Sequence, residues 1–224
     1  MLPWRTLDRA LMNDGCEMTL ARRGDEHSIR VDGDMLMTSG SHGSEEKLAE
    51  HGCAGLDTLP HARVLVGGLG MGFTARAALA ALRPDAVVDV VELVGAVVRW
   101  NRQLIGHLAD APLLDPRVRI TEGDVADAIA TAREHYDAIL LDVDNGPEAF
   151  TCRENRHLYS LEGLRRTRKA LRPNGVLAVW STFASSAFTA RLREVDLETR
   201  LVRVRANRHS NRRHSLWLGR RSNA

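Results

Sequence analysis

The segment from Arg63 to Glu92, RVLVGGLGMGFTARAALAALRPDAVVDVVE, constrains the fold more than any other part of the chain. It opens with a short β-branched run and continues through four glycines within six residues. A helical pattern of small residues follows, and a second apolar run ends in the acid Glu92. Short continuous apolar runs are typical of buried strands. The segment therefore predicts a strand, a tight turn, a helix and a second strand with a carboxylate at its end.

The glycine turn and the acid after it predict a binding site for an adenosine-containing cofactor. Glycine lets the backbone turn tightly and approach a ligand closely, and the N-terminus of the following helix offers unpaired N–H groups. A carboxylate at the end of the second strand can accept hydrogen bonds from both hydroxyl groups of a ribose. The predicted cofactor ligands in this segment are Gly67, Gly68, Gly70, Gly72 and Glu92.

From residue 63 onward, strands and helices are expected to alternate. The expected strands are 63–67, 86–92, 117–121, 136–142 and 175–181, and the expected helices are 72–82, 95–108, 125–134, 161–171 and 184–193. Two further alternating runs, Leu201–Arg205 and Ser215–Arg220, are expected to pair as a hairpin. Alternation of this kind with apolar strands predicts an α/β fold. Its centre is a Rossmann-like, seven-stranded, mostly parallel sheet covered on both faces.

The N-terminal part of the chain follows a different pattern. Residues 17–38 alternate apolar and polar side chains, with turn signals at Gly24-Asp25 and Asp32-Gly33, which predicts a small β-meander. A short helix, EEKLAEHG, follows it and is expected to stop at Gly52. The expected division is an N-terminal meander with a linker helix over 1–50 and a cofactor-binding domain over 51–224.

Composition narrows the class of protein. The 224 residues are 44% hydrophobic and 27% charged, as in an ordinary soluble domain, and no apolar run is long enough to span a membrane. Three scattered cysteines predict a reducing, cytoplasmic location. The net charge of +2 gives no polyanion signature, and the arginine-rich C-terminus has no interleaved aromatic residues to stack bases. Nucleic acid is therefore not the expected partner.

Acids at the ends of the later strands are the candidate cofactor-binding and catalytic residues. Asp124 follows the third expected strand, where a carboxylate can accept a hydrogen bond from an adenine amino group. Asp142 ends the fourth strand and Asp144 lies two residues beyond it. The carboxyl ends of strands in an open α/β sheet face the ligand crevice, and a carboxylate there can orient or deprotonate an amine. Asp142 and Asp144 are therefore the predicted catalytic residues, and no spacing of His, Cys and Asp predicts a metal site.

Five motifs in order resemble the class I S-adenosylmethionine-dependent transferases, and more narrowly the spermidine synthase family with its small bacterial relatives. They are VLVGGLGMG, VVELVGAVVRWNR, GDVADAI, DAILLDVDNGP and LYSLEGL. The resemblance implies S-adenosylmethionine or its decarboxylated form as cofactor, with Glu92 on the ribose and Asp124 near the adenine. It also implies Asp142 as the base or amine-orienting acid and a two-fold homodimer.

Two departures from the family pattern bear on the reaction. Spermidine synthases carry an aspartate inside the glycine turn, where this chain has Gly70 or Met71, and a tyrosine-bearing acidic motif, for which only Glu45 and Glu46 are available. A turn without the acid favours ordinary S-adenosylmethionine, and so a methyltransferase acting on a small molecule. The alternatives are a polyamine aminopropyltransferase that uses the decarboxylated cofactor, a non-catalytic nucleoside-binding protein and an RNA methyltransferase.

Substrate contacts and assembly complete the expectations. Asp142 is expected to contact the small-molecule acceptor, and His42, in a Gly/Ser loop beside the expected cofactor entrance, is a further candidate contact. Tyr159 either lines the acceptor pocket or packs under the following helix. The meander carries apolar side chains on both alternations, which favours pairing with a second copy. These side chains are Met18, Leu20, Met35, Leu36 and Met37.

Overall fold

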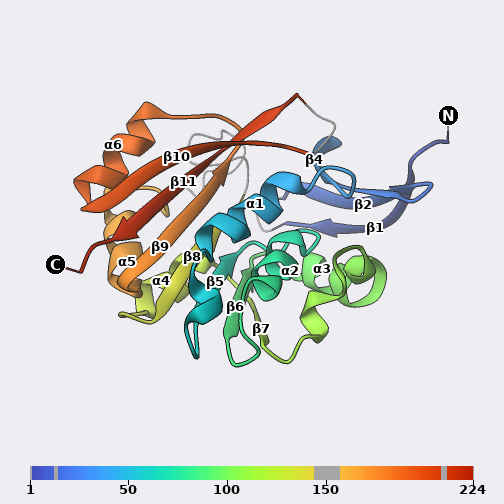
Figure 1. The fold of residues 1–224 in the computed structure, drawn as a ribbon. Coiled ribbons are helices and arrows are strands. Elements are labelled where there is room, and N and C mark those ends of the chain that lie inside the picture. The colour runs from blue at the N-terminus through green and yellow to red at the C-terminus, as the bar shows by residue number, and fades with distance from the viewer. Residues whose placement is uncertain (1, 13–14, 144–156, 208–210, 224) are drawn as a thin grey trace.

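The computed structural model describes residues 2–12, 15–143, 157–207 and 211–223 (Figure 1). Among these residues the strands form two sheets. The smaller sheet is an antiparallel meander in the order β1-β2-β3-β4. Its strands are β1 (Arg5–Leu11), β2 (Glu17–Arg23), β3 (Glu26–Val31) and β4 (Asp34–Thr38). The sequence predicted β2 to β4; it did not predict β1, a mostly exposed strand with charges among its apolar residues.

The larger sheet has seven strands in the order β10-β11-β9-β8-β5-β6-β7. Neighbours from β9 to β7 pair in parallel, and β11 pairs antiparallel with both β9 and β10. This confirms the predicted fold class. The strands are β5 (Arg63–Gly67), β6 (Val87–Glu92), β7 (Val118–Glu122), β8 (Tyr136–Leu141), β9 (Leu171–Ser181), β10 (Leu197–Arg205) and β11 (Arg213–Arg221).

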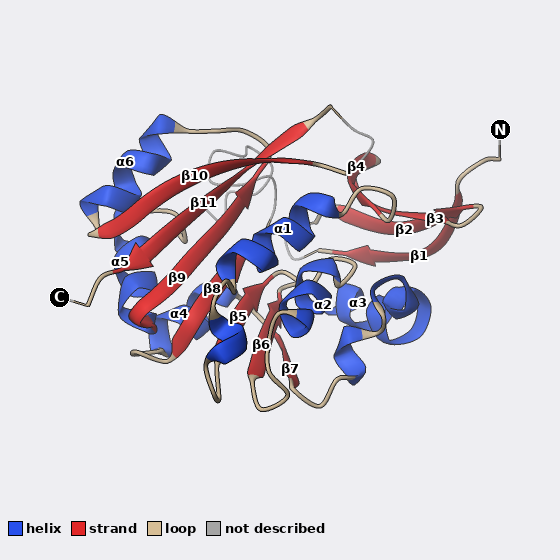
Figure 2. Ribbon diagram, viewed as in Figure 1, coloured by secondary structure: helices blue, strands red, loops and turns tan. Residues whose placement is uncertain are grey.

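Helices cover both faces of the large sheet (Figure 2). Side chains from α1, α2 and α3 share one apolar cluster with the β5 residues Val64 and Val66, whereas Leu65 joins the cluster of α4, α5 and α6. This alternation follows from the period of two in a strand. The helices are α1 (Gly43–Gly52), α2 (Phe73–Ala80), α3 (Gly95–Trp100), α4 (Val125–Thr131), α5 (Leu161–Ala170) and α6 (Ser186–Glu194).

The helix expected over 95–108 is the largest departure from the sequence analysis. The α-helical part ends at Trp100, and a π-helical turn over Asn101–Ile105 and a 3₁₀ turn over Gly106–Ala109 follow. The amide of Asn101 donates to the carbonyl oxygens of Val97 and Gly70, at 2.9 and 2.8 Å. Asn101 therefore links this irregular helix to the glycine turn, and that link accompanies the change of helical period.

Helix α1 crosses the predicted division at residue 50 and packs on the large sheet. Gly52 is its last residue, and a Cβ built there would lie 2.2 Å from Cδ2 of Leu140 in β8 and 3.1 Å from Cβ of Ala178 in β9. The glycine therefore does more than end the helix, because it allows α1 to approach the sheet closely. The 50/51 division of the chain stays a prediction.

The pairing of two copies through the N-terminal sheet also stays a prediction. Leu7 and Leu11 of β1 are partly and largely exposed, as expected of a sheet that pairs with a second copy. Met18 and Leu20 are buried, however, and Met35 and Leu36 line a cavity within the chain. Of the described helices, none combines the length and the apolar character that crossing a membrane requires.

We predict that Gly52→Ala lowers the free energy of unfolding by about 1–3 kcal/mol, because the added methyl group overpacks the contact between α1 and β8. Gly123→Ala is the matched control, because a Cβ at Gly123 meets nothing within 4 Å. Its effect should stay within about 0.5 kcal/mol. Urea denaturation of both variants checks this, and equal effects would contradict the close approach of α1.

Candidate functional site

The glycine turn between β5 and α2 joins three strand ends. The N–H of Gly68 donates to the carbonyl of Val91 at the end of β6, and the N–H of Asp142 donates to the carbonyl of Gly67, each at 2.9 Å. Gly68 has φ +87°, and a Cβ there would lie 2.5 Å from the carbonyl oxygen of Asp142. Only glycine fits both the left-handed backbone and this close approach. The turn therefore brings the ends of β5, β6 and β8 together at one edge of the sheet.

The N-terminal sheet covers the middle of this turn. Gly70 has φ +51°, and a Cβ there would lie 3.1 Å from the sulfur of Met37 in β4. Gly72 precedes α2 with φ +89°. Gly70, one of the two positions at which the resemblance places an acid, is thus a left-handed glycine whose side-chain position lies against a thioether. The sequence shows the missing acid, but it does not show that Met37 lies against the turn.

Glu92 is a buried carboxylate at the end of β6 and is 8% exposed. One oxygen accepts from the N–H of Leu69 in the glycine turn, and the other accepts from the N–H of Val94, both at 2.8 Å. Burial and these two bonds exclude an ordinary surface acid. They hold the carboxylate at a set orientation in the wall of the cavity described below.

Asp124 serves two purposes. Its carboxylate caps α4 by accepting from the N–H of Ala126 at 2.8 Å, and it also lines the cavity. The second carboxylate oxygen lies 3.5 Å from Nε2 of His157. The capping role and the position expected for an adenine contact are therefore compatible in the same side chain.

Asp142 follows β8 and lines the cavity. Its Oδ2 accepts a 2.5 Å hydrogen bond from the hydroxyl of Thr74, the second residue of α2. Loss of water around the carboxylate raises the pKa of Asp142 to about 6, although the Thr74 bond acts in the opposite direction. Asp144, the other predicted catalytic acid, lies outside the described residues.

Glu45 is the second carboxylate at this end of the cavity, and it is 8% exposed. Burial, and then the charge of Asp142, raise the pKa of Glu45 to about 8. Glu45 and Glu46 were equivalent candidates in the sequence, but α1 places only Glu45 in the cavity. Glu46 pairs outside the cavity with Arg76 and His42.

The helical period contains the signal that distinguishes the two acids. The buried residues of α1 are Ser44, Glu45, Leu48, Ala49 and Gly52. Glu45 is thus three, four and seven residues from apolar or small positions, which places it on the same helix face. The spacing in the sequence therefore favours Glu45 over Glu46 as the inward-facing acid.

The structure places two other candidates apart from the cavity. His42 stacks on Phe73 with ring centroids 4.1 Å apart, and its Nδ1 lies 3.0 Å from Glu46. Tyr159 is 2% exposed and packs edge-on against Phe188 in the cluster of α4, α5 and α6. Neither is among the described residues that line the cavity. For Tyr159 this corresponds to the packing alternative, because its ring is on the opposite side of the sheet from α1.

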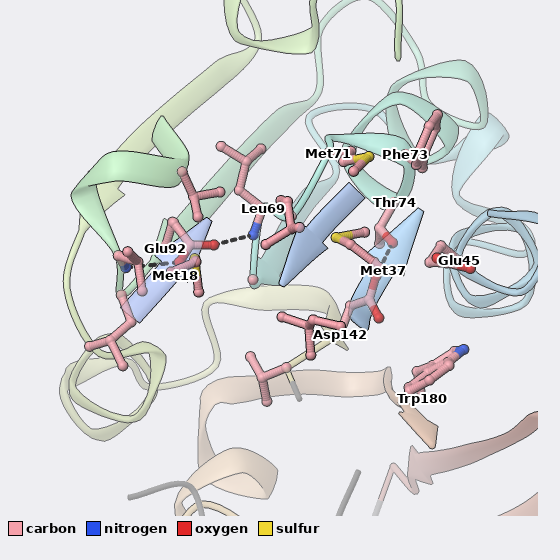
Figure 3. Close-up of a pocket in the computed structure, with 18 of the residues that line it drawn as sticks. Met18, Met37, Glu45, Leu69, Met71, Phe73, Thr74, Glu92, Asp142 and Trp180 are labelled. Atoms are coloured by element: carbon pink, nitrogen blue, oxygen red, sulfur yellow. Dashed lines mark hydrogen bonds between the residues drawn. The ribbon is translucent and has the colours of Figure 1, made fainter. Parts of the chain in front are cut away.

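The cavity has a volume of about 650 Å³ and lies at the carboxyl edge of the sheet. Figure 3 shows Glu92 toward one side, Glu45 and Trp180 toward the other, and Asp142 and Thr74 between them. Met37 reaches in from the N-terminal sheet, and His214 of β11 lines the same cavity. Thr74, Trp180 and His214 are cavity residues that were not predicted from the sequence.

Electrostatics define what this arrangement can bind. Glu45 and Asp142 line the same cavity, and burial raises the pKa of both carboxyl groups. A positively charged ligand would stabilise their ionised forms and lower both pKa values, because opposite charges within a few ångströms favour ionisation. The cavity is therefore suited to a cation such as a protonated amine. Among the described residues there is no cluster of three or more His, Cys, Asp or Glu side chains that could hold a metal ion.

Similarity to known proteins covers part of the chain in sequence and nearly all of it in fold. No protein-family model matches. Polyamine aminopropyltransferase 1 of Streptomyces coelicolor is 32% identical over 126 residues, which are 54% of this chain and 22% of that protein. Polyamine aminopropyltransferase 2 of the same organism is 38% identical over 54% of this chain and 21% of its own length. Putrescine N-methyltransferase 2 of Nicotiana attenuata is 34% identical over 54% of this chain and 32% of its own length.

Solved structures extend the likeness across the fold. Spermidine synthase from Thermotoga maritima superposes with a TM-score of 0.77, at 19% identity, over 98% of this chain and 73% of that chain. The chain therefore has the fold of the solved spermidine synthases. A probable spermidine synthase from Corynebacterium glutamicum has a TM-score of 0.65 at 18% identity, over 98% of this chain and 80% of that chain. The resemblance drawn from the motifs is thus confirmed, and the chain spans about a fifth to a third of the length of the curated relatives it matches.

We predict that Glu45→Gln stabilises the fold at high pH. The pKa of Glu45 lies above its ordinary value of 4.5, so the native chain loses stability as pH rises from about 4.5 through about 8. The glutamine side chain does not ionise, so the variant avoids the loss of stability that ionisation of Glu45 causes. At pH 9 the variant should be more stable than the parent by at least about 1 kcal/mol, and at pH 4 the difference should vanish.

Urea unfolding at both pH values measures the effect. Glu50→Gln is the control, because Glu50 lies exposed on the same helix in an ion pair with Lys47. An identical pH dependence in the two variants would show that Glu45 ionises as a surface acid does.

Proposed function

We propose that this chain is a transferase that alkylates an amine of the polyamine class with a sulfonium cofactor of the S-adenosylmethionine type. The observation that carries the proposal is the pair of desolvated carboxylates, Glu45 and Asp142, in one cavity beside the glycine turn. A polyamine is a flexible chain with several ammonium groups, and its positive charge would stabilise the ionised forms of both acids.

The residues present fit the cofactor. The glycine turn forms a cradle that a Cβ at Gly68 would fill, and Glu92 holds a fixed, buried carboxylate beside it. Asp124 lies in the same cavity, whose volume of about 650 Å³ suits a nucleoside together with an acceptor. Glu92 would hold the ribose and Asp124 the adenine edge.

The chemistry required of the protein is positioning and proton removal. The cofactor, when bound, supplies a carbon bonded to positively charged sulfur. The sulfur leaves as a neutral thioether, so no acid is needed to protonate it. The attacking nitrogen needs a free lone pair, whereas an amine in water at neutral pH is mostly protonated. Asp142 would accept or direct that proton, while Glu45 holds positive charge on the acceptor in line for attack.

Aminopropyl transfer is the form of the reaction that we favour. The sequence analysis favoured methyl transfer because the glycine turn has no acid, but the comparisons support the aminopropyl alternative better. The bond from Thr74 to Asp142 also brings carboxylate charge next to the turn from outside it. That charge attracts an ammonium tail and repels a carboxylate tail, which favours the decarboxylated cofactor.

Methyl transfer is the second candidate. Gly70 contacts the thioether of Met37 where an acid would pair with an aminopropyl ammonium, and two relatives are named putrescine N-methyltransferases. The two reactions release different nucleosides, so one assay separates them.

We predict that the protein consumes decarboxylated S-adenosylmethionine with putrescine or spermidine and releases methylthioadenosine. Asp142→Asn should lower kcat by about 10²- to 10⁴-fold with little change in cofactor affinity, as expected for loss of a proton acceptor. Asp127→Asn, an exposed position on α4, is the control. Release of S-adenosylhomocysteine from ordinary S-adenosylmethionine would establish methyl transfer instead. Binding without either product would indicate a nucleoside-binding protein.

We predict that Glu92→Gln weakens cofactor binding at least about tenfold, because charge-assisted hydrogen bonds to the ribose are lost. Glu122→Gln is the matched control: Glu122 is opposite Glu92 in the parallel register of β6 and β7 and is not among the described cavity residues. Titration calorimetry checks both variants. Equal affinities would remove Glu92 from the cofactor site.

A further inference from the structure

Three buried side chains from opposite ends of the chain form a hydrogen-bonded row that ends at Glu45. The hydroxyl of Ser44 donates to Oε2 of Glu45 at 2.7 Å, and Nδ1 of His214 lies 2.9 Å from that hydroxyl oxygen. Ser44 is fully buried and His214 is 7% exposed. Ser44 and Glu45 belong to α1, whereas His214 belongs to β11, so only the tertiary fold brings the three together.

Counting protons assigns the direction of both bonds. An ionised carboxylate only accepts hydrogen bonds, so Ser44 must use its single proton on Glu45. The Ser44 oxygen can then only accept from the ring, and Nδ1 of His214 must carry a proton. The neutral ring therefore holds its proton on Nδ1 and has a lone pair on Nε2 whenever Glu45 is ionised.

The surroundings keep His214 uncharged. Burial, and then the charge of Arg212, lower the pKa of His214 to about 4. Its ring packs edge-on against Trp180 with centroids 4.7 Å apart, and Nε2 has no hydrogen-bond partner among the described residues. A neutral histidine that donates to Ser44 adds no charge to the site, so it supports the carboxylate without competing with a cationic acceptor.

We propose that Ser44 and His214 are positioning residues that hold the ionised Glu45 carboxylate toward the amine acceptor, with His214 neutral and protonated on Nδ1. The proposal rests on the function proposed above for the same cavity. Ser44 and His214 act through Glu45, whereas Asp142 accepts or directs the proton of the reacting nitrogen. The pair thereby sets the pH above which the site accepts a cationic amine.

Other charged groups lie around the hydrogen-bonded row. Asp142 faces Glu45 from the end of β8, and Arg212 faces His214 from the residues before β11. Glu46, the neighbouring acid on α1, is paired with Arg76 and His42. The bond from Ser44 lowers the pKa of Glu45, so its removal must shift the ionisation of Glu45 upward.

The first experiment needs no activity. The 224-residue chain is labelled with ¹⁵N in histidine and ¹³C in the glutamate side chain, and titrated by NMR. Above pH 9 the ring nitrogens of His214 should show the Nδ1–H tautomer, and Ser44→Ala should raise the titration midpoint of Glu45 by about one pH unit. An Nε2–H tautomer, or an unchanged Glu45 midpoint, would overturn the proposal.

The second experiment measures amine use across pH. In Ser44→Ala the acidic limb of kcat/KM should move to higher pH, and at pH 7 KM for the amine should rise about tenfold with a smaller change in kcat. His214→Leu should behave in the same way, whereas His214→Asn, which keeps an N–H near the Nδ1 position, should restore most of the loss. If His214→Asn does not restore amine use, or if the acidic limb of kcat/KM does not shift, the row has only a packing role.

Thr189→Val is the control for loss of a buried hydroxyl. Its hydroxyl oxygen accepts from the indole of Trp217 at 2.9 Å, in the cluster on the other face of the sheet. It should leave the pH profile unchanged. If no polyamine is alkylated but the NMR results hold, the proposed function fails and the arrangement of Glu45 stands. If transfer occurs and the NMR results do not hold, the positioning role fails alone.

Discussion

The closest contact between the glycine turn and β8 is the constraint on which the site depends. With φ +87° at Gly68, the backbone passes so near the carbonyl of Asp142 that no side chain fits between them. This contact sets where β8 ends relative to β5, and it delivers Asp142 to the cavity beside Thr74. Glu92 adds the third strand end through its bond to Leu69. The glycine turn proposed to hold the cofactor and the carboxylate proposed to act on the amine are therefore parts of one backbone arrangement.

The second level of organisation is electrostatic. Glu45 and Asp142 line the same cavity, where burial raises the pKa of both carboxyl groups and the charge of Asp142 raises that of Glu45 further. Ionisation of both groups lowers the stability of the fold. A cation bound beside the two carboxylates would offset that loss. The hydroxyl of Ser44, backed by the neutral ring of His214, lowers this cost at one of the two acids without introducing a charge.

The site also explains why the N-terminal sheet and the C-terminal hairpin accompany the central fold. Met37 reaches the glycine turn from β4, and His214 reaches α1 from β11. Both segments lie outside the alternating strands and helices that build the cofactor cradle. They line the cavity at the end where the acceptor amine is proposed to bind.

The sequence by itself determined the central sheet, the glycine turn and the positions of Glu92, Asp124 and Asp142. These follow from local rules: apolar runs make strands, glycines make the turn, and an acid directly after a strand lies at the sheet edge. The helical period even contained the choice of Glu45 over Glu46, because Glu45 shares a face with Leu48 and Ala49. Only the tertiary structure decided what meets across long separations. The contact of His214 with Ser44 spans 170 residues, and no local pattern encodes it. The same holds for the placement of Tyr159 against Phe188, where the choice between two alternatives depended on which face of the sheet buries the ring.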